Sequence, residues 1–197
     1  MPTTPLFRSM RPRFSRWLLC RALTLGPLAM PSQADLLKTA DFPARLDGPS
    51  PPLERKNQAI LTYLWTDVYA AAFYAEPKVS AKQAAITQSP QKLELYYFRD
   101  IDRDDVIKAA NAALDKQQTK ETLARLRPEL ERLHRSFQDI KQGDRYDLSW
   151  DRSDGLNLTR NGHVIFASPD PELAKVYFAI RLAPDGLSTD LREALLK

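Results

Sequence analysis

The sequence predicts an α+β fold in which helices pack on a mainly antiparallel sheet. Three features support this class. Residues 53–99 are rich in aromatic and β-branched residues, residues 102–137 contain two segments with helical periodicity, and a second group of strands and then of helices follows. Strands that are grouped apart from helices, instead of alternating with them one by one, are typical of α+β folds.

Residues 1–34 resemble a secretory signal peptide. They contain five arginines and no acidic residue, with a mainly apolar stretch from Trp17 to Met30 and small residues before a cut that we expect after Ala34. This stretch of 14 residues is shorter than the roughly 20 that span a bilayer. We expect a signal peptide over 1–34, one domain over 35–197 without a membrane-spanning segment, and a periplasmic or otherwise exported location. A leader that is kept as a short anchor is the alternative.

Removal of the leader changes the charge balance. The whole chain has 29 basic and 25 acidic side chains and a formal net charge of +4. The leader carries five of the basic residues and none of the acidic ones, so the remaining 163 residues carry 24 against 25, a formal net charge of −1. No basic stripe with interleaved aromatic residues remains. We therefore expect no nucleic-acid partner, because such binding depends on neutralising phosphates.

The few glycine, cysteine and histidine residues exclude several kinds of site. The 6 glycines are too far apart for the phosphate-binding loops GxGxxG and GxxxxGK[ST], which excludes Rossmann and P-loop enzymes. Cys20, His134 and His163 cannot form a usual zinc site, so no metal and no cofactor is expected. The aspartates of residues 100–105 lack the glycine and glutamate of a calcium-binding loop, and a helix start explains them better.

The first half of the domain predicts three strands. Residues 35–54 contain four prolines and predict an irregular lead-in with one short strand around Ala44 to Asp47. The segment from Leu53 to Ala75 predicts two strands that separate near Leu61 to Tyr63. Both faces of the second strand are mostly apolar, so it should be a central strand that is covered on both sides. After a proline-bounded connection, the alternation from Lys92 to Arg99 predicts a third strand.

Helices and shorter strands follow. A helix capped by Asp102 and a second one from about Thr119 are predicted, and Pro128 should kink or split the second. Three short strands follow Gly143, and Asn161-Gly162 between the last two predicts a two-residue hairpin, because a type I′ turn requires positive φ at both central residues. Asp170-Pro171 then begins a buried helix. A last helix is capped by the aspartate at position 190.

The residues offer few candidates for catalysis. His134 and His163 are expected on the surface, and no catalytic triad is visible. Asp67 lies between Trp65 and Tyr69 on one face of a strand that we expect to be buried, so its charge must be paired, shifted in pKa or at a cleft. Structural pairing with an arginine, or a strand end that reaches solvent, is the alternative for Asp67. Tyrosine side chains could add hydroxyl donors to an apolar pocket.

Four stretches, taken together, resemble the bacterial branch of the chalcone isomerase-like family. They are WTDVYAAAFYAE (65–76), LELYYFRDIDRDDV (93–106), FQDIKQGDRYDLSW (137–150) and NGHVIFASPDPELAKVYFAIRLAPDGLSTDLREALL (161–196). The resemblance implies an open-faced β-sandwich, in which a mainly antiparallel sheet carries helices on one face and a ligand cleft lies between them. The sequence departs from the family at Arg181, in place of a usual Trp, and at Phe166, in place of a frequent Gly, and both would reshape the cleft.

The resemblance also implies roles for individual residues. The plant enzymes use an Arg, a Thr, a Tyr and an Asn around the cleft; Tyr69 stands at the Thr position and Asn111 at the Asn position, whereas Asp104 replaces the Tyr. The Arg position falls at Asn57 or Lys56, with Arg55 adjacent. Non-catalytic members of the family bind fatty acids through a Tyr at the Thr position and an upstream Arg. The resulting ligand-binding candidates are Arg55, Lys56, Asp67, Tyr69 and Asn111.

Three functions remain open. The leading hypothesis is an exported, non-catalytic protein that binds a fatty acid or a similar small apolar carboxylate in the cleft, with Arg55 or Lys56 and Tyr69 at the carboxylate. The runner-up is an intramolecular lyase or other isomerase that uses Tyr69 and Asn111. The third is an interaction module of the cell envelope whose cleft is filled by side chains. An apolar tunnel with one cation would favour the first, a full set of polar groups the second, and a filled cleft the third.

Overall fold

A computed structural model describes residues 32–47 and 51–197, and all of its elements lie in one compact unit, Pro31–Lys197. The strands are β1 (Arg45–Leu46), β2 (Leu53–Tyr63), β3 (Thr66–Ala75), β4 (Gln91–Tyr97), β5 (Arg145–Asp151), β6 (Gly155–Arg160) and β7 (His163–Ser168). The helices are α1 (Gln33–Ala40), α2 (Ala81–Thr87), α3 (Arg103–Gln117), α4 (Lys120–Ser136), α5 (Pro171–Leu182) and α6 (Thr189–Leu195). The apolar stretch of the expected leader lies outside the described residues.

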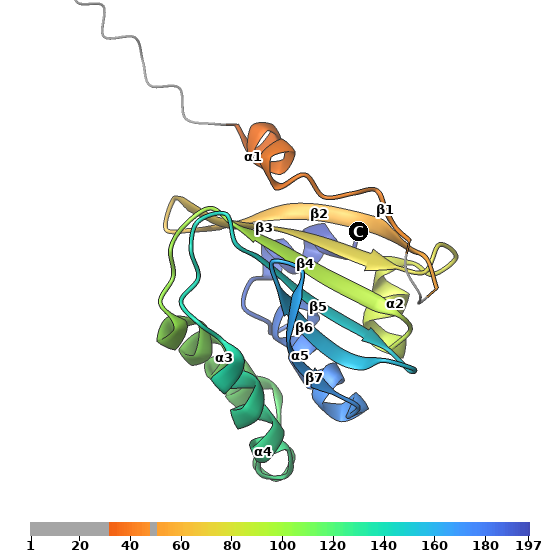
Figure 1. Ribbon diagram of the computed structural model, residues 1–197, viewed down its shortest axis with the longest axis vertical. Helices are drawn as coiled ribbons and strands as arrows, with labels where there is room; N and C mark the ends of the chain where they lie inside the picture. Colours follow the sequence, from red (N-terminus) through yellow and green to blue (C-terminus); the bar gives the residue numbers. More distant parts are fainter. Residues whose placement is uncertain (1–31, 48–50) are drawn as a thin grey trace, which may run out of the picture. The chain divides into compact units, whose positions relative to one another are not determined.

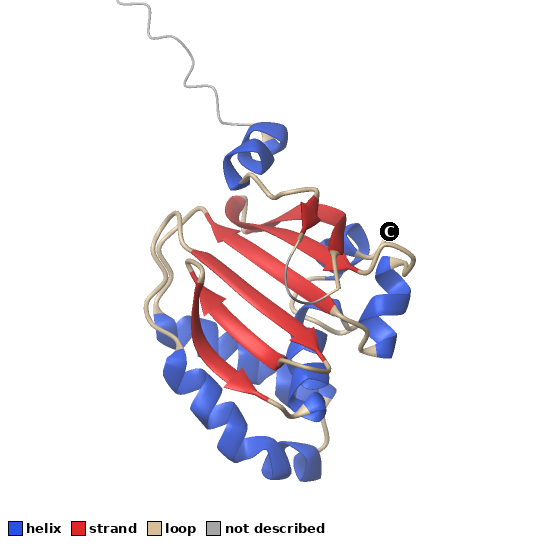
Figure 2. Ribbon diagram, turned by 45° about the vertical axis from the view of Figure 1, so that its right-hand side comes forward, coloured by secondary structure: helices blue, strands red, loops and turns tan. Residues whose placement is uncertain are grey.

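The strands of the described chain form one antiparallel sheet in the order of the sequence (Figure 1). Each strand pairs with the next one along the chain, although α2 lies between β3 and β4, and α3 and α4 lie between β4 and β5. Figure 2 shows the strands as a curved layer with most helices gathered on one side. The α+β class, the antiparallel sheet and the packing of helices on one face of it are therefore as the sequence predicted.

The two faces of the sheet bury different clusters. On β3, Tyr69 and Phe73 point to the face that α2 to α6 cover, which we call the helix face, and they belong to the main core. Ala72 and Tyr74 point to the opposite face, which we call the outer face, where Phe42 and side chains of α1 pack on them. The strand is buried on both sides, which confirms the expectation of a central strand.

α1 occupies a segment that was expected to be irregular, and α2 lies in the proline-bounded connection between β3 and β4, for which no element was predicted. α1 begins with a capping box, in which the Ser32 side chain accepts from the Asp35 N–H and the Asp35 carboxylate accepts from Ser32. The cut expected after Ala34 falls in the first turn of this helix. α2 is capped by Ser80, whose side chain accepts from Gln83 N–H. Each cap depends on one serine in a segment that also contains prolines, so the sequence indicates these helices only weakly. The prediction of an irregular lead-in was wrong over α1.

Three further expectations about helices differ from the structure. The last helix, α6, is capped by Ser188, whose side chain accepts from Leu191 N–H, and not by Asp190, which lies in the first turn. Pro128 does not split α4, which runs as one helix through this exposed position. Buried Leu126 and Leu130 on either side of Pro128 hold the two halves against the core, which offsets the lost backbone hydrogen bond. Asp102 occupies the cap position of α3 without a capping hydrogen bond from its side chain. Instead, Asp139 accepts from the backbone N–H of Arg103 at 3.1 Å.

Two hairpins turn through two residues with positive φ. Asn161 and Gly162 connect β6 and β7 with φ values of 51° and 81°, as predicted. β2 and β3 are connected by Leu64 and Trp65, with φ values of 45° and 64°, so the predicted break at residues 61–63 was placed slightly too early. Within residues 32–47 and 51–197, no helix combines the length and hydrophobicity needed to cross a bilayer.

Candidate functional site

A small cavity lies between the helix face of the sheet and α5. Leucines from β4, β5 and β6 form its apolar wall, and Phe137 closes it beside the end of α4. Its polar groups are Tyr97, Tyr146, Tyr177 and Arg181. The volume is about 20 Å³, which is room for about one water molecule. The position between sheet and helices is the one in which a ligand cleft was expected, but side chains fill most of it.

Arg181 brings a cation to this cavity from α5. It lies one helical turn after Tyr177, so both side chains project from the same side of the helix. Its Nε is shielded from solvent and has no hydrogen-bond partner of good geometry. Burial lowers the pKa of Arg181, but the phenols of Tyr69, Tyr97 and Tyr177, which ionise only at high pH where arginine titrates, outweigh burial there and raise the pKa. The guanidinium is therefore always charged.

No carboxylate of the described residues neutralises this charge. The groups that act on the pKa of Arg181 are tyrosines, and none of the ion pairs in the described ranges includes it. A buried cation without an anion is costly unless something else pairs with it. A negatively charged group at this cavity would therefore pair with Arg181.

Tyrosine rings surround the guanidinium. The ring centres of Tyr69 and Tyr97 are 5.3 Å apart, and those of Tyr97 and Tyr146 are 5.9 Å apart. Burial raises the pKa of Tyr97 and of Tyr177, so both phenols are neutral and can donate. The hydroxyls of Tyr69 and Tyr146 are buried without a well-oriented partner. Buried polar atoms without partners suit a water molecule or a ligand head group.

Of the residues proposed from the sequence, only Tyr69 lies beside this cavity. The Cζ of Arg181 is 6.0 Å from the centre of the Tyr69 ring, and Tyr69 is 4% exposed. Asp67 lies near the start of β3 and is partly exposed, where its Oδ1 accepts from Thr62 Oγ1 at 2.7 Å. Asp67 therefore fits the alternative expected for it from the sequence, a position at a strand end that reaches solvent.

The two proposed cations of β2 point away from Tyr69. A bulge between Arg55 and Asn57 shifts the register, so that Arg55 pairs with Tyr74 and turns to the outer face. There its guanidinium donates to the carbonyl oxygen of Phe42. The Nζ of Lys56 donates to the carbonyl oxygen of Pro77 at 3.1 Å, near the edge of the sheet. The structure therefore does not bring Arg55 or Lys56 together with Tyr69.

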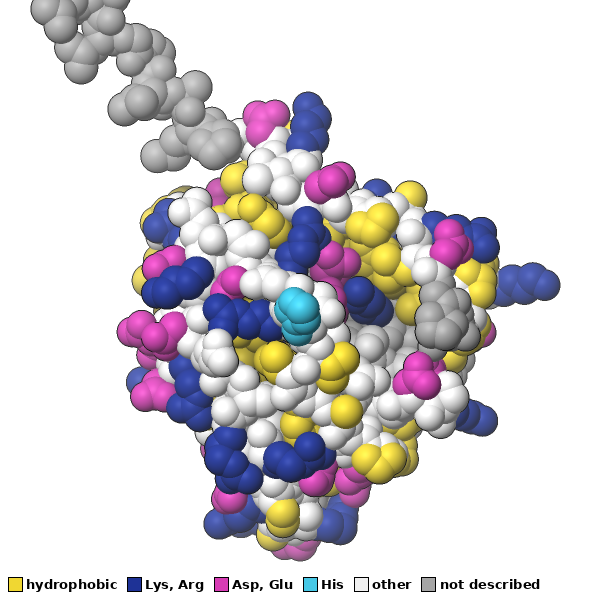
Figure 3. All heavy atoms as spheres, in the orientation of Figure 1, with side chains coloured by type: hydrophobic (Ala, Val, Ile, Leu, Met, Phe, Trp, Pro, Cys, Tyr) yellow, Lys and Arg dark blue, Asp and Glu magenta, His cyan; other side chains and the backbone are white. Residues whose placement is uncertain are grey.

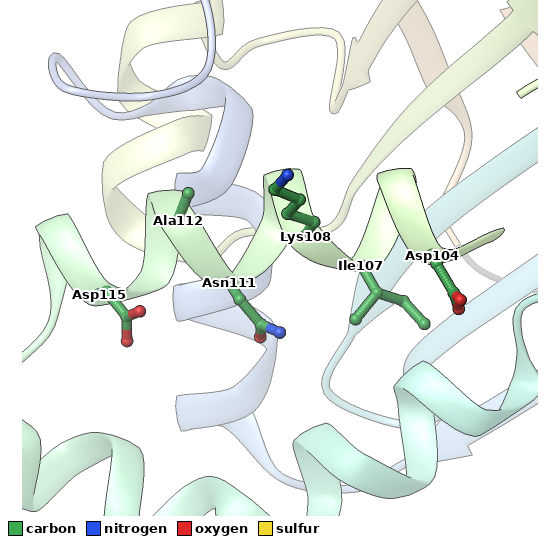
Figure 4. Close-up of a pocket in the computed structure, with 6 residues that line it drawn as sticks. All are labelled: Asp104, Ile107, Lys108, Asn111, Ala112 and Asp115. Atoms are coloured by element: carbon green, nitrogen blue, oxygen red, sulfur yellow. The ribbon is translucent and has the colours of Figure 1, made fainter. Parts of the chain in front are cut away.

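Asn111 lies on the solvent side of α3. Figure 4 shows it in a shallow hollow of about 470 Å³ whose lining residues, Asp104 among them, all belong to this helix. Because Ala110, Ala113 and Leu114 are the residues that α3 buries, Asn111 projects away from the cavity. Asp104 and Asn111 thus line the same hollow about two helical turns apart, and both are separate from Tyr69.

His134 is buried, so its expected surface position was wrong. Its exposed fraction is 9%, its ring centre is 6.1 Å from that of Tyr177, and its Nε2 has no partner. Burial lowers the pKa of His134, and the positive charge of Arg103 lowers it further. The packing of α4 against α5 covers this position, which the periodicity of α4 alone did not show. His163 is exposed, as expected.

A second polar cluster lies on the outer face. Glu94 is 5% exposed and forms an ion pair with Arg145, whose guanidinium also donates to the carbonyl oxygen of Ala40. Burial raises the pKa of Glu94, and the charge of Asp147 adds to this effect, whereas Lys92 and Arg145 oppose it. Lys92 and Asp147 form a neighbouring ion pair at 3.3 Å. Because its charges are paired and Arg145 holds the end of α1, we assign this cluster a structural role.

On the face in Figure 3, basic and acidic side chains are interspersed. Across residues 32–47 and 51–197, no group of three or more His, Cys, Asp or Glu side chains is arranged to hold a metal ion.

Comparison with known proteins agrees with this architecture. Residues 36–197 match the family described as chalcone isomerase-like. No curated protein sequence matches the chain. Among solved structures, the crystal structure of a fatty-acid binding protein of Arabidopsis thaliana is similar, with a TM-score of 0.56 and 16% identity over 79% of this chain and 90% of that one. At this identity the similarity concerns the fold.

Proposed function

The chain belongs to the chalcone isomerase-like family, and on this basis we propose that it binds a fatty acid or a similar small apolar carboxylate between sheet and helices and catalyses no reaction. The observation that carries the proposal is Arg181, a cation in an apolar cavity without an acidic partner among the described residues. The fatty-acid binding protein with a similar fold supports the same class of ligand.

A carboxylate head group would supply hydrogen-bond acceptors to the polar atoms of the cavity. The buried Nε of Arg181 and the hydroxyl of Tyr69 are donors that make no hydrogen bond of good geometry, although the two side chains are close enough for Tyr69 to raise the pKa of Arg181. A guanidinium and a carboxylate form strong charge-assisted hydrogen bonds, and a phenol adds a further donor. In this proposal Arg181 of α5 supplies the charge that the resemblance assigned to β2.

The apolar tail requires more room than the cavity offers. The volume of about 20 Å³ is far below the roughly 300 Å³ at which ligand pockets begin. The stacked rings of Phe137 and Tyr146, with centres 5.6 Å apart, occupy part of the space. We propose that the tail enters when these side chains rotate and α5 moves from the sheet, as happens in proteins that rearrange on binding.

The same small volume favours a second candidate, an interaction module of the cell envelope with a filled cavity. Such a protein would bind no apolar ligand, and Arg181 would be satisfied by water. The isomerase alternative has no comparable support, because Asn111 lies on the far side of α3 from Tyr69.

We also propose that the chain is exported, which the basic and apolar leader sequence supports. A cut after Ala34 would remove Ser32 and with it the capping box of α1. Mass spectrometry of the protein that accumulates after expression of the full-length chain tests this proposal. A mature mass beginning at Asp35 supports cleavage, whereas an intact mass together with membrane association supports the anchor.

The ligand is tested on the same preparation. Native mass spectrometry and solvent extraction should detect a co-purifying fatty acid in wild-type protein and lose it in Arg181→Met and in Tyr69→Phe. Arg135→Met is the matched control, because Arg135 is an exposed arginine of α4 that does not line the cavity and makes only a long 3.9 Å ion pair with Glu131. An empty wild-type protein that also resists loading with added dodecanoate would contradict the binding proposal and favour the interaction module.

A further inference from the structure

The β2–β3 hairpin ends in three exposed apolar side chains, Tyr63, Leu64 and Trp65, which we call the aromatic tip. Their exposed fractions are 67%, 75% and 99%. The tip lies at the end of the sheet where the connections after β4 and before β5 also lie (Figure 1). A side chain that is 99% exposed contributes nothing to the core, so packing against the described residues does not explain Trp65.

Turn geometry does not explain the aromatic tip either. Leu64 and Trp65 both have positive φ, which bulky residues rarely adopt because the Cβ approaches the backbone carbonyl. A two-residue turn of this kind favours Asn-Gly. The chain uses this pair, Asn161 and Gly162, in its other two-residue hairpin. Leucine and tryptophan therefore stand at a position where the backbone disfavours them and water surrounds them, which indicates a contact outside the chain.

We propose that the aromatic tip inserts into the interfacial region of a lipid bilayer. Tryptophan and tyrosine combine an apolar ring with a polar group and are enriched where acyl chains meet head groups. Leu64 between them adds a purely apolar side chain that can reach the acyl chains. A hairpin end presents all three at a convex point, a shape that enters a fluid surface more readily than it fits a protein pocket.

The size of the aromatic tip favours a bilayer over a protein partner. Three such side chains expose on the order of 400 Å², whereas a stable protein interface takes about 800 Å² from each partner. A positive charge stands beside the tip. Arg99 is exposed, forms no ion pair within the described ranges, and donates from Nε to the carbonyl oxygen of Asp67 at 3.2 Å. This bond holds the guanidinium near the base of the hairpin, where lipid phosphates would lie.

Tryptophan fluorescence can report on the aromatic tip directly. The chain has three tryptophans, of which Trp17 is in the leader and Trp150 is 6% exposed. In the full-length chain with Trp17→Phe, a change in emission on adding vesicles therefore reports on Trp65. We use vesicles of phosphatidylcholine and phosphatidylglycerol, with and without bromine on the acyl chains. The expected result is a shift of the emission to shorter wavelength and quenching by the brominated lipid.

The matched variant combines Leu64→Asn with Trp65→Gly in the same full-length background. It keeps the two-residue turn with better-suited residues, so a loss of binding does not reflect unfolding, and a thermal melt checks this. Because the leader is present in both proteins, the difference in partitioning measures the tip. We expect partitioning to weaken by on the order of tenfold or more, since two large apolar side chains are lost.

Two results would overturn the proposal. The first is equal partitioning of the two proteins with no bromine quenching of Trp65. The second is a shift of Trp65 emission with protein concentration in the absence of vesicles, which would mean that the tip contacts a second copy of the chain. The measurement uses no fatty acid, so its outcome is independent of the proposed ligand.

Discussion

The Cζ of Arg181 on α5 lies 6.0 Å from the centre of the Tyr69 ring on β3. This contact joins the helix layer to the sheet beside the cavity, and it brings together the Nε of Arg181 and the hydroxyl of Tyr69, two buried polar atoms without a hydrogen bond of good geometry. In a structural ion pair, a carboxylate would complete the arrangement. No carboxylate of the described residues pairs with Arg181. If Arg181 serves ligand binding, it is kept at a cost in stability, and its replacement should stabilise the protein.

Arg181→Met should raise the free energy of unfolding by about 1 kcal/mol, because an apolar side chain of similar length replaces a buried charge without a partner. Urea unfolding of the two proteins measures the difference. Arg135→Met, at an exposed position, should change the value by less than about 0.5 kcal/mol. A loss of about 2 kcal/mol or more in Arg181→Met would mean that the guanidinium is part of the structural framework.

The combined substitution Leu64→Asn and Trp65→Gly should raise the free energy of unfolding by about 1–2 kcal/mol. Both native residues have positive φ, and asparagine and glycine adopt this conformation at lower cost. Denaturant unfolding monitored by circular dichroism measures the effect without tryptophan emission. If the variant is less stable, the native side chains make contacts within the fold that their exposure does not reveal.

Neutral His134 should make the protein sensitive to mild acid. Burial and the charge of Arg103 lower its pKa in the folded state, whereas the unfolded chain has the ordinary value of 6.5. Above pH 6.5 the stabilising contribution is complete, and it is lost as the pH falls toward the folded pKa, because the unfolded state binds the proton first. His134→Leu should flatten this part of the stability profile.

The control for the pH profile is His163→Gln, at the only other histidine of the chain, which is exposed. Its profile should follow that of the wild type in this range. A wild-type stability that is constant from pH 7 to about 5, where the unfolded histidine gains its proton, would contradict the assignment of a buried, neutral His134.

Gly155→Ala should destabilise the protein more than Gly162→Ala. Both glycines have positive φ, 75° and 81°, so alanine costs about 1–2 kcal/mol at either position. At Gly155 a Cβ would also lie 2.5 Å from the carbonyl oxygen of Ser168, whereas at Gly162 nothing lies within 4 Å. We expect at least about 1 kcal/mol more at Gly155. If thermal melts show equal losses of stability for the two variants, the backbone where the start of β6 meets the end of β7 moves enough to accommodate the added Cβ.

The strands of the sheet were predicted more accurately from the sequence than the helices and turns around them. The apolar character of both faces of β3 identified a central strand, and Asn161-Gly162 identified the last hairpin, because each pattern has few physical alternatives. α1 was missed because its capping box, Ser32 to Asp35, lies between prolines and next to the expected cut. The turn at Leu64 and Trp65 was misplaced because it lacks the residues that such a turn favours.

The candidate site was predicted only in part. Tyr69, one of the candidates, lies beside the cavity. Arg181 stood out as a departure from the family pattern, but its position depends on which side of α5 faces the sheet. The face of Arg55 depends on one bulge between it and Asn57, which no sequence pattern marks. Without the bulge, Arg55 would share the face of Asn57 and Tyr69, because alternate residues of a strand point to the same side.

Calorimetric titration with dodecanoate, with dodecanol as its uncharged counterpart, tests the central claim most directly. If Arg181 receives a carboxylate, wild-type protein binds dodecanoate about tenfold or more tightly than dodecanol, since charge-assisted hydrogen bonds contribute upwards of 1.5 kcal/mol. Arg181→Met should lose this preference, and Arg135→Met should keep it. Equal affinity of wild type and Arg181→Met for dodecanoate, or no binding of either ligand, would contradict the claim.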